Sequence, residues 1–223
     1  MAEHPDQETR ERLLTAATRL FAEQGFDAVT VRDICRRASA NVAAVNYHFG
    51  GKVGLYEQVM DSAIRIMQAT TEEARRQGQR KTPHEQLRIY VRVFISRVAA
   101  GSGGTWIHQL MMREISNPTP ALDMVIDQVI RPRMTFLSGI VAELTGRQPD
   151  DARVMSCAFS VHAQCVALIN HRIAERVNAA FAMTPDRIEE TIDHVTRFSL
   201  AGISAMALPR KPGGGRTRSN APV

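Results

Sequence analysis

Apolar residues recur every three or four positions along almost the whole chain, and helix-capping residues separate the stretches that show this spacing. In residues 7–24, Leu13, Ala17 and Leu20 fall on one helical face, and Gly25 follows as a stop signal. No segment shows the strict alternation of apolar and polar residues that is typical of a strand. The chain is therefore predicted to be all-α.

The start and stop signals predict about nine helices. Thr30, Asn41 and the pair Thr82-Pro83 are residue types that begin helices, and a kink is expected at Pro132. The expected helices cover 7–24, 30–37, 41–48, 52–76, 83–100, 105–116, 120–146, 149–178 and 185–207. We expect the first three to form a small N-terminal domain, residues 1–52, and the others a larger helical bundle, residues 53–207.

Composition excludes several classes of protein. The 223 residues include three cysteines, which is too few for a disulfide framework. Residues 1–6 have neither the basic nor the apolar region of a secretion signal, and no apolar stretch of about 18 residues could cross a membrane. We therefore expect a cytoplasmic protein that makes no membrane contact.

The net charge of +5 comes mostly from the C-terminal end of the chain. Residues 208–223 hold no acidic residue and carry, among prolines and glycines, Arg210, Lys211, Arg216 and Arg218. This composition predicts a disordered basic tail, and whether the tail adds to nucleic-acid binding stays open. The high overall charge is therefore weak evidence about the folded part.

The two short helices 30–37 and 41–48, joined by a tight turn, have the layout of a helix-turn-helix unit. Ala43 and Ala44 make the second helix slim enough to enter a major groove about 12 Å wide. Polar side chains on this helix would read base edges, and groups flanking it would hold phosphates. The predicted DNA-contacting residues are Thr30, Arg32, Asn41, Val42, Ala43, Ala44, Asn46, Tyr47, His48 and Lys52. Arg36 and Arg37 are expected to be ordinary surface charges.

Residues 30–38 and 41–52, preceded by Ala17, Phe21 and Gly25, resemble the DNA-binding domain of TetR-family regulators. Later segments, Arg113-Glu114, Pro120-Ala121-Leu122 and 128–132, resemble the CecR-like subgroup of that family. The resemblance implies a homodimeric transcription factor, usually a repressor, which a small molecule in the C-terminal domain releases from its operator. The sequence departs from the family pattern at Ser39, where glycine is usual, and at Asn46, where a phosphate-binding tyrosine is frequent.

Candidate pocket residues lie on two of the expected helices. The wall of a ligand pocket is predicted at Trp106, His108, Met111, Met112, His162 and Cys165, with ordinary core packing as the alternative. A metal site is not expected, because the chain has no CxxC pair and no HExxH motif. The identity of the effector cannot be read from these residues.

The last two long helices have broad apolar faces, and we expect them to pair with the same helices of a second subunit. The faces comprise Val154, Cys157, Ala158, Val161, Cys165, Leu168 and Ile169 on one helix, and Ile188, Ile192, Val195, Leu200 and Ile203 on the other. A dimer would double the contacts of one short reading helix on a pseudo-palindromic operator.

The sequence thus predicts a DNA-binding regulator that is not an enzyme and needs no cofactor. It contains no nucleophile elbow, Walker loop or dinucleotide fingerprint. Two alternatives stay open: an architectural DNA-binding protein without an effector, and a helical-bundle enzyme that uses His162 and Cys165. A cavity too small for a ligand would favour the architectural protein.

Overall fold

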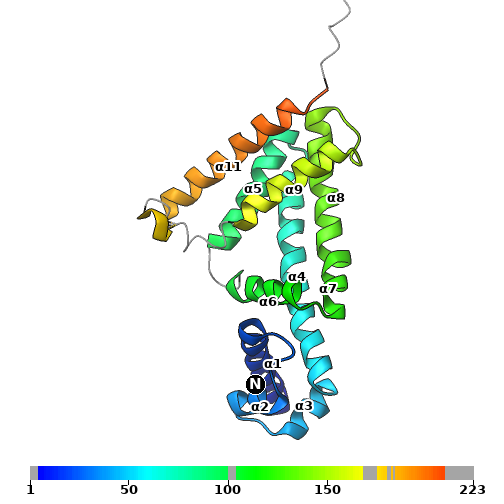
Figure 1. The fold of residues 1–223 in the computed structure, drawn as a ribbon, viewed down its shortest axis with the longest axis vertical. Coiled ribbons are helices and arrows are strands. Elements are labelled where there is room, and N and C mark those ends of the chain that lie inside the picture. The colour runs from blue at the N-terminus through cyan, green and yellow to red at the C-terminus, as the bar shows by residue number, and fades with distance from the viewer. Residues whose placement is uncertain (1–4, 100–103, 168–174, 180–181, 183, 209–223) are drawn as a thin grey trace, which may run out of the picture.

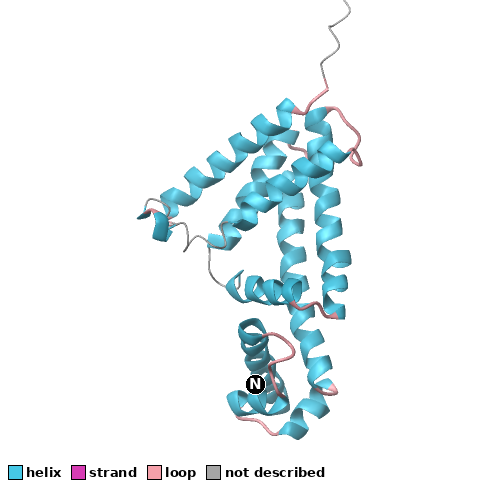
Figure 2. Cartoon of the chain, in the orientation of Figure 1, coloured by secondary structure: helices cyan, strands magenta, loops and turns pink. Residues whose placement is uncertain are grey.

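The protein is described here from a computed structural model, which covers residues 5–99, 104–167, 175–179, 182 and 184–208 (Figure 1). All regular elements within these ranges are helices (Figure 2). They are α1 (Pro5–Gln24), α2 (Val31–Ala38), α3 (Val42–Phe49), α4 (Lys52–Gly78), α5 (Pro83–Ala99), α6 (Gly104–Ser116), α7 (Pro120–Val125), the π-helical η1 (Ile126–Ile130), α8 (Arg131–Thr145), α9 (Ala152–Ala167) and α11 (Pro185–Ala205). None of the described helices is long and apolar enough to span a bilayer.

The helices arrange as a small head and a larger body (Figure 1). Helices α1, α2 and α3 lie at one end, and α4 runs from this head into the body. Helix α5 packs along α4, and α8, α9 and α11 pack against α5 and against one another, while α6 crosses between the two parts. The prediction of an all-α chain with an N-terminal helix-turn-helix and a larger helical bundle is confirmed.

The predicted helix 120–146 is three segments in the structure, which is why the described residues hold more α-helices than expected. Pro132 has no N–H to donate to the carbonyl of Gln128, four residues earlier. The Gln68 amide of α4 donates to that carbonyl instead, at 3.2 Å, and a π-helical turn takes up the change in register.

The ends of the last helices differ from the prediction. Helix α9 begins at Ala152 rather than at Pro149, because the Asp151 carboxylate caps it by accepting from the Arg153 amide at 2.8 Å. The predicted continuation of this helix beyond residue 167 falls partly on residues 168–174, which lie outside the described residues. The predicted basic tail from residue 209 onward lies outside them as well.

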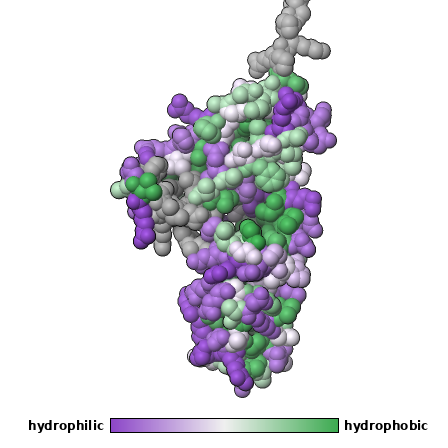
Figure 3. Space-filling model, viewed as in Figure 1, coloured by the Kyte–Doolittle hydropathy of each residue, from purple (hydrophilic) through white to green (hydrophobic). Residues whose placement is uncertain are grey.

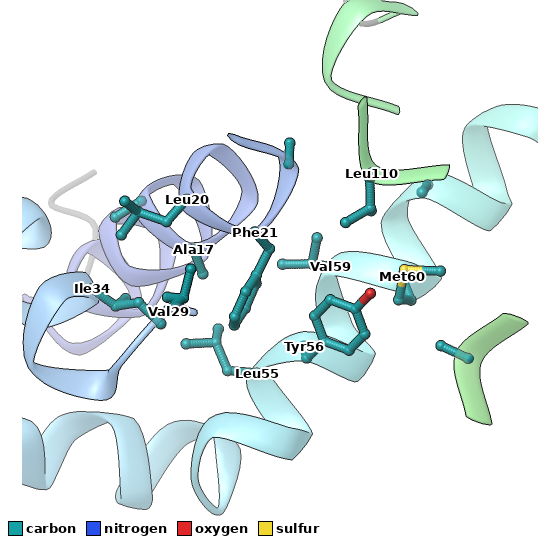
Figure 4. Close-up of a cluster of buried hydrophobic side chains, with 14 of the residues drawn as sticks. Ala17, Leu20, Phe21, Val29, Ile34, Leu55, Tyr56, Val59, Met60 and Leu110 are labelled. Atoms are coloured by element: carbon teal, nitrogen blue, oxygen red, sulfur yellow. The ribbon is translucent and has the colours of Figure 1, made fainter. Parts of the chain in front are cut away.

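Two cores stabilise the described chain, and they do not follow the predicted domain boundary. The first joins Phe21 and Ile34 of the head to Val59 of α4 and Leu110 of α6 (Figure 4). The second lies in the body and includes Tyr90, which is fully buried. Helix α6 is therefore packed into the core of the head, although it follows in sequence only after α5.

The second core corrects one expectation. The apolar residues predicted to face a partner subunit are largely buried inside one chain: Val154, Ala158, Val161, Cys165, Ile192, Val195 and Ile203. They fill the space between α5, α8, α9 and α11, so they cannot also form a surface. Leu168 and Ile169 lie outside the described residues.

Candidate nucleic-acid interface and cavity

Helices α2 and α3 form a tightly capped unit. The Thr30 hydroxyl accepts from the Asp33 amide at 3.2 Å, while the Asp33 carboxylate accepts from the Thr30 amide at 3.2 Å. Ser39 ends α2 in a left-handed conformation with φ +50°, and the Asn41 side chain then caps α3 through the Ala43 amide at 3.0 Å. These caps fix the angle at which α3 leaves the turn.

The outer face of α3 holds most of the predicted reading residues. Tyr47 is 77% exposed, and Asn41, Ala43 and Asn46 are exposed beside it. Val42 adds a partly exposed apolar side chain at the helix start. The face is thus slim at Ala43 and polar further along, as entry into a major groove requires.

Two residues that were predicted to contact DNA do not lie on the outer face of α3. The His48 side chain is only 8% exposed, and its Nε2 lies 3.4 Å from the Asp6 carboxylate of α1. Ala44 packs against the core of the head. Helical geometry causes both results, because positions 44 and 48 share the face that α3 turns toward α1 and α4.

Cationic groups flank the reading face. Arg32 and Arg37 are exposed and form no ion pair within the described residues. Arg36 instead pairs with Asp33, and hydrogen bonds from Thr30 and the Arg36 charge lower the pKa of the Asp33 carboxyl. The Lys52 ammonium lies 4.3 Å from the centre of the Phe26 ring, so it is held at the start of α4.

The sequence reasoning missed Gly54 at the junction of α3 and α4. A Cβ atom at this position would lie 2.0 Å from the Phe49 carbonyl oxygen, which is backbone and cannot move aside easily. Only glycine therefore allows the two helices to meet at this angle. The sequence signal for this close contact was a glycine at the third position of a helix, where glycine costs stability relative to alanine.

A cavity of about 270 Å³ lies in the body, lined by residues of α4 to α9 and of η1. Most of its lining is apolar, including Ile66, Phe94, Ile107, Leu122 and Ile130. The predicted residues His108, Met111, His162 and Cys165 line it. Trp106 and Met112 do not: Trp106 packs against the core of the head, and Met112 is exposed.

Burial keeps His162 and Cys165, two of the residues that line the cavity, uncharged at neutral pH. The Tyr90 hydroxyl lies 2.9 Å from Nδ1 of His162, and burial with the nearby Arg133 charge lowers the pKa of His162 to about 4. Burial raises the pKa of the Cys165 thiol to about 12. At neutral pH His162 is therefore an uncharged imidazole, and Cys165 is a thiol rather than a thiolate nucleophile.

Arg133 is a cavity residue that the sequence reasoning missed. It is 5% exposed, its Nε donates to the Thr71 hydroxyl at 3.1 Å, and its Nη2 donates to the Met67 carbonyl at 3.0 Å. The sequence signal for its burial was its position four residues after Val129 and four before Leu137, which places all three on one helical face.

Helix α6 touches both the cavity and the head. Ile107 and Met111 line the cavity, whereas Leu110 lies in the core of the head. The buried Glu114 carboxylate accepts from the Tyr56 hydroxyl of α4 and from the Thr119 amide, the latter at 3.2 Å. Arg113 donates to the Glu23 carbonyl at the end of α1 at 2.7 Å.

A helix-turn-helix head joined to a larger helical body is the architecture of a class of DNA-binding regulators. Comparison with known proteins agrees. Residues 13–59 match the family "Bacterial regulatory proteins, tetR family", and residues 83–203 match "HTH-type transcriptional dual regulator CecR, C-terminal domain". The chain belongs to the TetR family, in its CecR-like branch, and is a DNA-binding transcriptional regulator.

Individual relatives show how far the likeness extends. The HTH-type transcriptional dual regulator CecR of Shigella flexneri is 29% identical over 160 residues, which cover 67% of this chain and 70% of that protein. SrpR of Pseudomonas putida is 38% identical over 56 residues, 25% of this chain and 26% of SrpR.

Solved structures share the fold at low identity. A TetR-family regulator from Streptomyces coelicolor superposes with a TM-score of 0.63 at 20% identity, covering 89% of this chain and 97% of that one. A TetR-like regulator from Rhodococcus sp. RHA1 superposes with a TM-score of 0.62 at 16% identity, and the match covers 88% of this chain and 96% of that one. Members of the family bind operator DNA as dimers and respond to small-molecule effectors.

Proposed function

We propose that this protein is a repressor that binds a pseudo-palindromic operator as a homodimer and leaves it when a small molecule fills the cavity. Residues 1–52 would bind DNA, and residues 53–207 would hold the effector and the partner subunit. The observation that carries the proposal is the double contact of α6, which lines the cavity with Met111 and enters the core of the head with Leu110. A ligand that moves α6 would thereby change the position of the reading helix.

The DNA contacts follow from exposure and charge. Asn41, Val42, Ala43, Asn46 and Tyr47 would reach base edges or sugar-phosphate from the outer face of α3. Their phosphate anchors would be Arg32, Lys52 and the free amides at the start of α2 beside Thr30. We assign His48 and Ala44 to the support of α3 instead, since both face inward.

Two features argue against the alternatives. A cavity of about 270 Å³ favours an effector over a purely architectural protein. A protonated Cys165 and a neutral His162 do not make a nucleophile and base, and no group of three metal-ligating side chains occurs in the described part of the chain. We therefore propose no enzymatic activity.

The proposal is tested by selecting bound DNA from a random pool and then measuring operator affinity for variants. Tyr47→Ala and Lys52→Ala should each weaken binding about tenfold, and Lys52→Ala should also reduce the slope of log affinity against log salt by about one. Lys81→Ala, an exposed lysine between α4 and α5, is the matched control and should change neither.

The same operator serves for the effector screen, in which small molecules are tested for release of the protein from DNA. Unchanged affinity in Tyr47→Ala and Lys52→Ala would show that α3 does not read the operator. A folded protein that selects no DNA sequence at all would overturn the proposed function.

A further inference from the structure

Arg133 carries a charge that no acidic side chain of the described residues neutralises. It is 5% exposed, yet it forms no ion pair within the described residues. Its side chain is held by the Thr71 hydroxyl, the Met67 carbonyl and the Phe94 ring, whose centre lies 4.8 Å away. Burial of an unpaired cation costs free energy, which an anion bound beside it would recover.

Arg133 keeps hydrogen-bond donors that its contacts with the described residues do not use. Thr71 and Met67 occupy one donor each on Nε and Nη2, and Nη1 has no partner among the described residues. Every fully buried side-chain nitrogen and oxygen atom of those residues has a partner. Nη1 is therefore not sealed in the core, and Arg133 is one of the residues that line the cavity.

The described lining of the cavity contains basic, uncharged polar and apolar residues but no acidic one. The titratable residues that line the cavity are Arg97, His108, Arg133, His162 and Cys165. No aspartate or glutamate among the residues that the structure describes lines it. A water-sized group occupies about 30 Å³. The cavity volume of about 270 Å³ therefore has room for a ligand of on the order of ten non-hydrogen atoms. The lining thus offers the Arg133 guanidinium together with mostly aliphatic and aromatic surface.

We propose that the effector is a small carboxylic acid with an apolar body, bound with its carboxylate on Arg133. The inference rests on the proposed function, in which the cavity is the effector site. A guanidinium is suited to this task because its planar array of donors matches a carboxylate, and such charged hydrogen bonds exceed neutral ones in strength.

The test compares two probes of the same length, sodium octanoate and 1-octanol, by calorimetric titration of the full chain at pH 7.4. We expect octanoate to bind about tenfold tighter than octanol to the unaltered protein. Arg133→Gln should abolish this preference, and Arg133→Lys, which keeps the charge, should retain part of it. Arg153→Gln removes an exposed cation of α9 that does not line the cavity, and it is the matched control that should keep the preference.

Thermal melting and helical circular dichroism show which variants fold. If Arg133→Gln does not fold, the comparison of the two probes on the unaltered protein still decides the anion preference. Equal binding of the two probes, binding of neither at millimolar concentration, or a preference that survives Arg133→Gln would overturn the inference. These outcomes leave operator selection unaffected, whereas octanoate binding without any DNA selection would overturn the proposed function alone.

Discussion

Ser39 and Arg80 are the residues other than glycine with positive φ in the described chain. At Ser39 the backbone must reverse between α2 and α3, and its amide contacts the Arg36 carbonyl while its side chain stays exposed. A Cβ atom is unfavourable in this conformation, so the turn is strained at a position that sets the geometry of the reading head.

Replacement of Ser39 by glycine should therefore stabilise the protein. We expect Ser39→Gly to raise the free energy of unfolding by about 1 kcal/mol, measured by urea denaturation. Ser39→Ala keeps the Cβ atom and is the control, for which no gain is expected. Equal stability of the glycine and alanine variants would show that the turn carries no such strain.

His162 should make the protein sensitive to acid. An unfolded histidine takes up a proton near pH 6.5, whereas the pKa of the folded His162 is lowered to about 4 by burial and by the Arg133 charge. Between these values the unfolded state binds more protons, so the free energy of unfolding falls as the pH falls. The loss between pH 7 and pH 5 should be about 2 kcal/mol from this group.

The contribution of His162 is measured by urea denaturation at both pH values. His162→Gln cannot titrate, and it should lose less stability than the unaltered protein over this interval. His84→Gln, at an exposed position near the start of α5, should keep the unaltered dependence. Identical pH dependence in the His162→Gln variant would contradict the assignment.

At the scale of elements, α6 is the connection between head and body. It reaches the head through Leu110, Arg113 and Glu114, and the cavity through its other face. The buried Glu114 carboxylate ties α6 to α4 and to the start of α7, because both the Tyr56 hydroxyl and the Thr119 amide donate to it. Helices α4 and α6 therefore both connect the head with the body.

Loss of the Glu114 carboxylate should loosen this junction. Glu114→Ala leaves the Tyr56 hydroxyl and the Thr119 amide without their acceptor in a buried site, and we expect the free energy of unfolding to fall by about 3 kcal/mol. Glu143→Ala removes an exposed carboxylate from α8 and is the matched control, with little expected change. An equally small loss of unfolding free energy in both variants would show that Glu114 does not hold the junction.

At the scale of the whole molecule, apolar residues remain on the outside of α9 and α11. Phe198 is 64% exposed, and Phe159 of α9 is 52% exposed. On the face shown in Figure 3, apolar and weakly polar residues gather over the part of the body that holds these helices. We propose this outer face, rather than the buried stripes predicted from periodicity, as the contact with the second subunit.

A charge on this face should separate the subunits. Phe198→Asp should sediment as a monomer at micromolar concentration and should bind the operator about a hundredfold more weakly, because the two reading heads are no longer linked. Met112→Asp places the same charge on an exposed apolar position of α6 and should leave the dimer intact. A Phe198→Asp protein that still sediments as a dimer would place the interface elsewhere.

The sequence by itself determined the helices and the helix-turn-helix, because the signals for them are local. The Thr30 cap with Asp33, the Asn41 cap and the Pro132 interruption each depend on residues within one or two helical turns. The exposed positions of Asn46 and Tyr47 followed from the same local geometry. The two caps and the exposed positions were predicted at the residues where the structure has them, whereas the interruption predicted at Pro132 lies at Ile126–Ile130.

Only the tertiary structure decided which side of each helix is inside. His48 faces α1, Trp106 packs into the head, the stripes of α9 and α11 meet each other, and Arg133 reaches the cavity. Periodicity shows that a helix has an apolar face, but it does not show which other element covers that face. That choice depends on the packing of segments distant in sequence, and it made α6 the neighbour of both the reading head and the cavity.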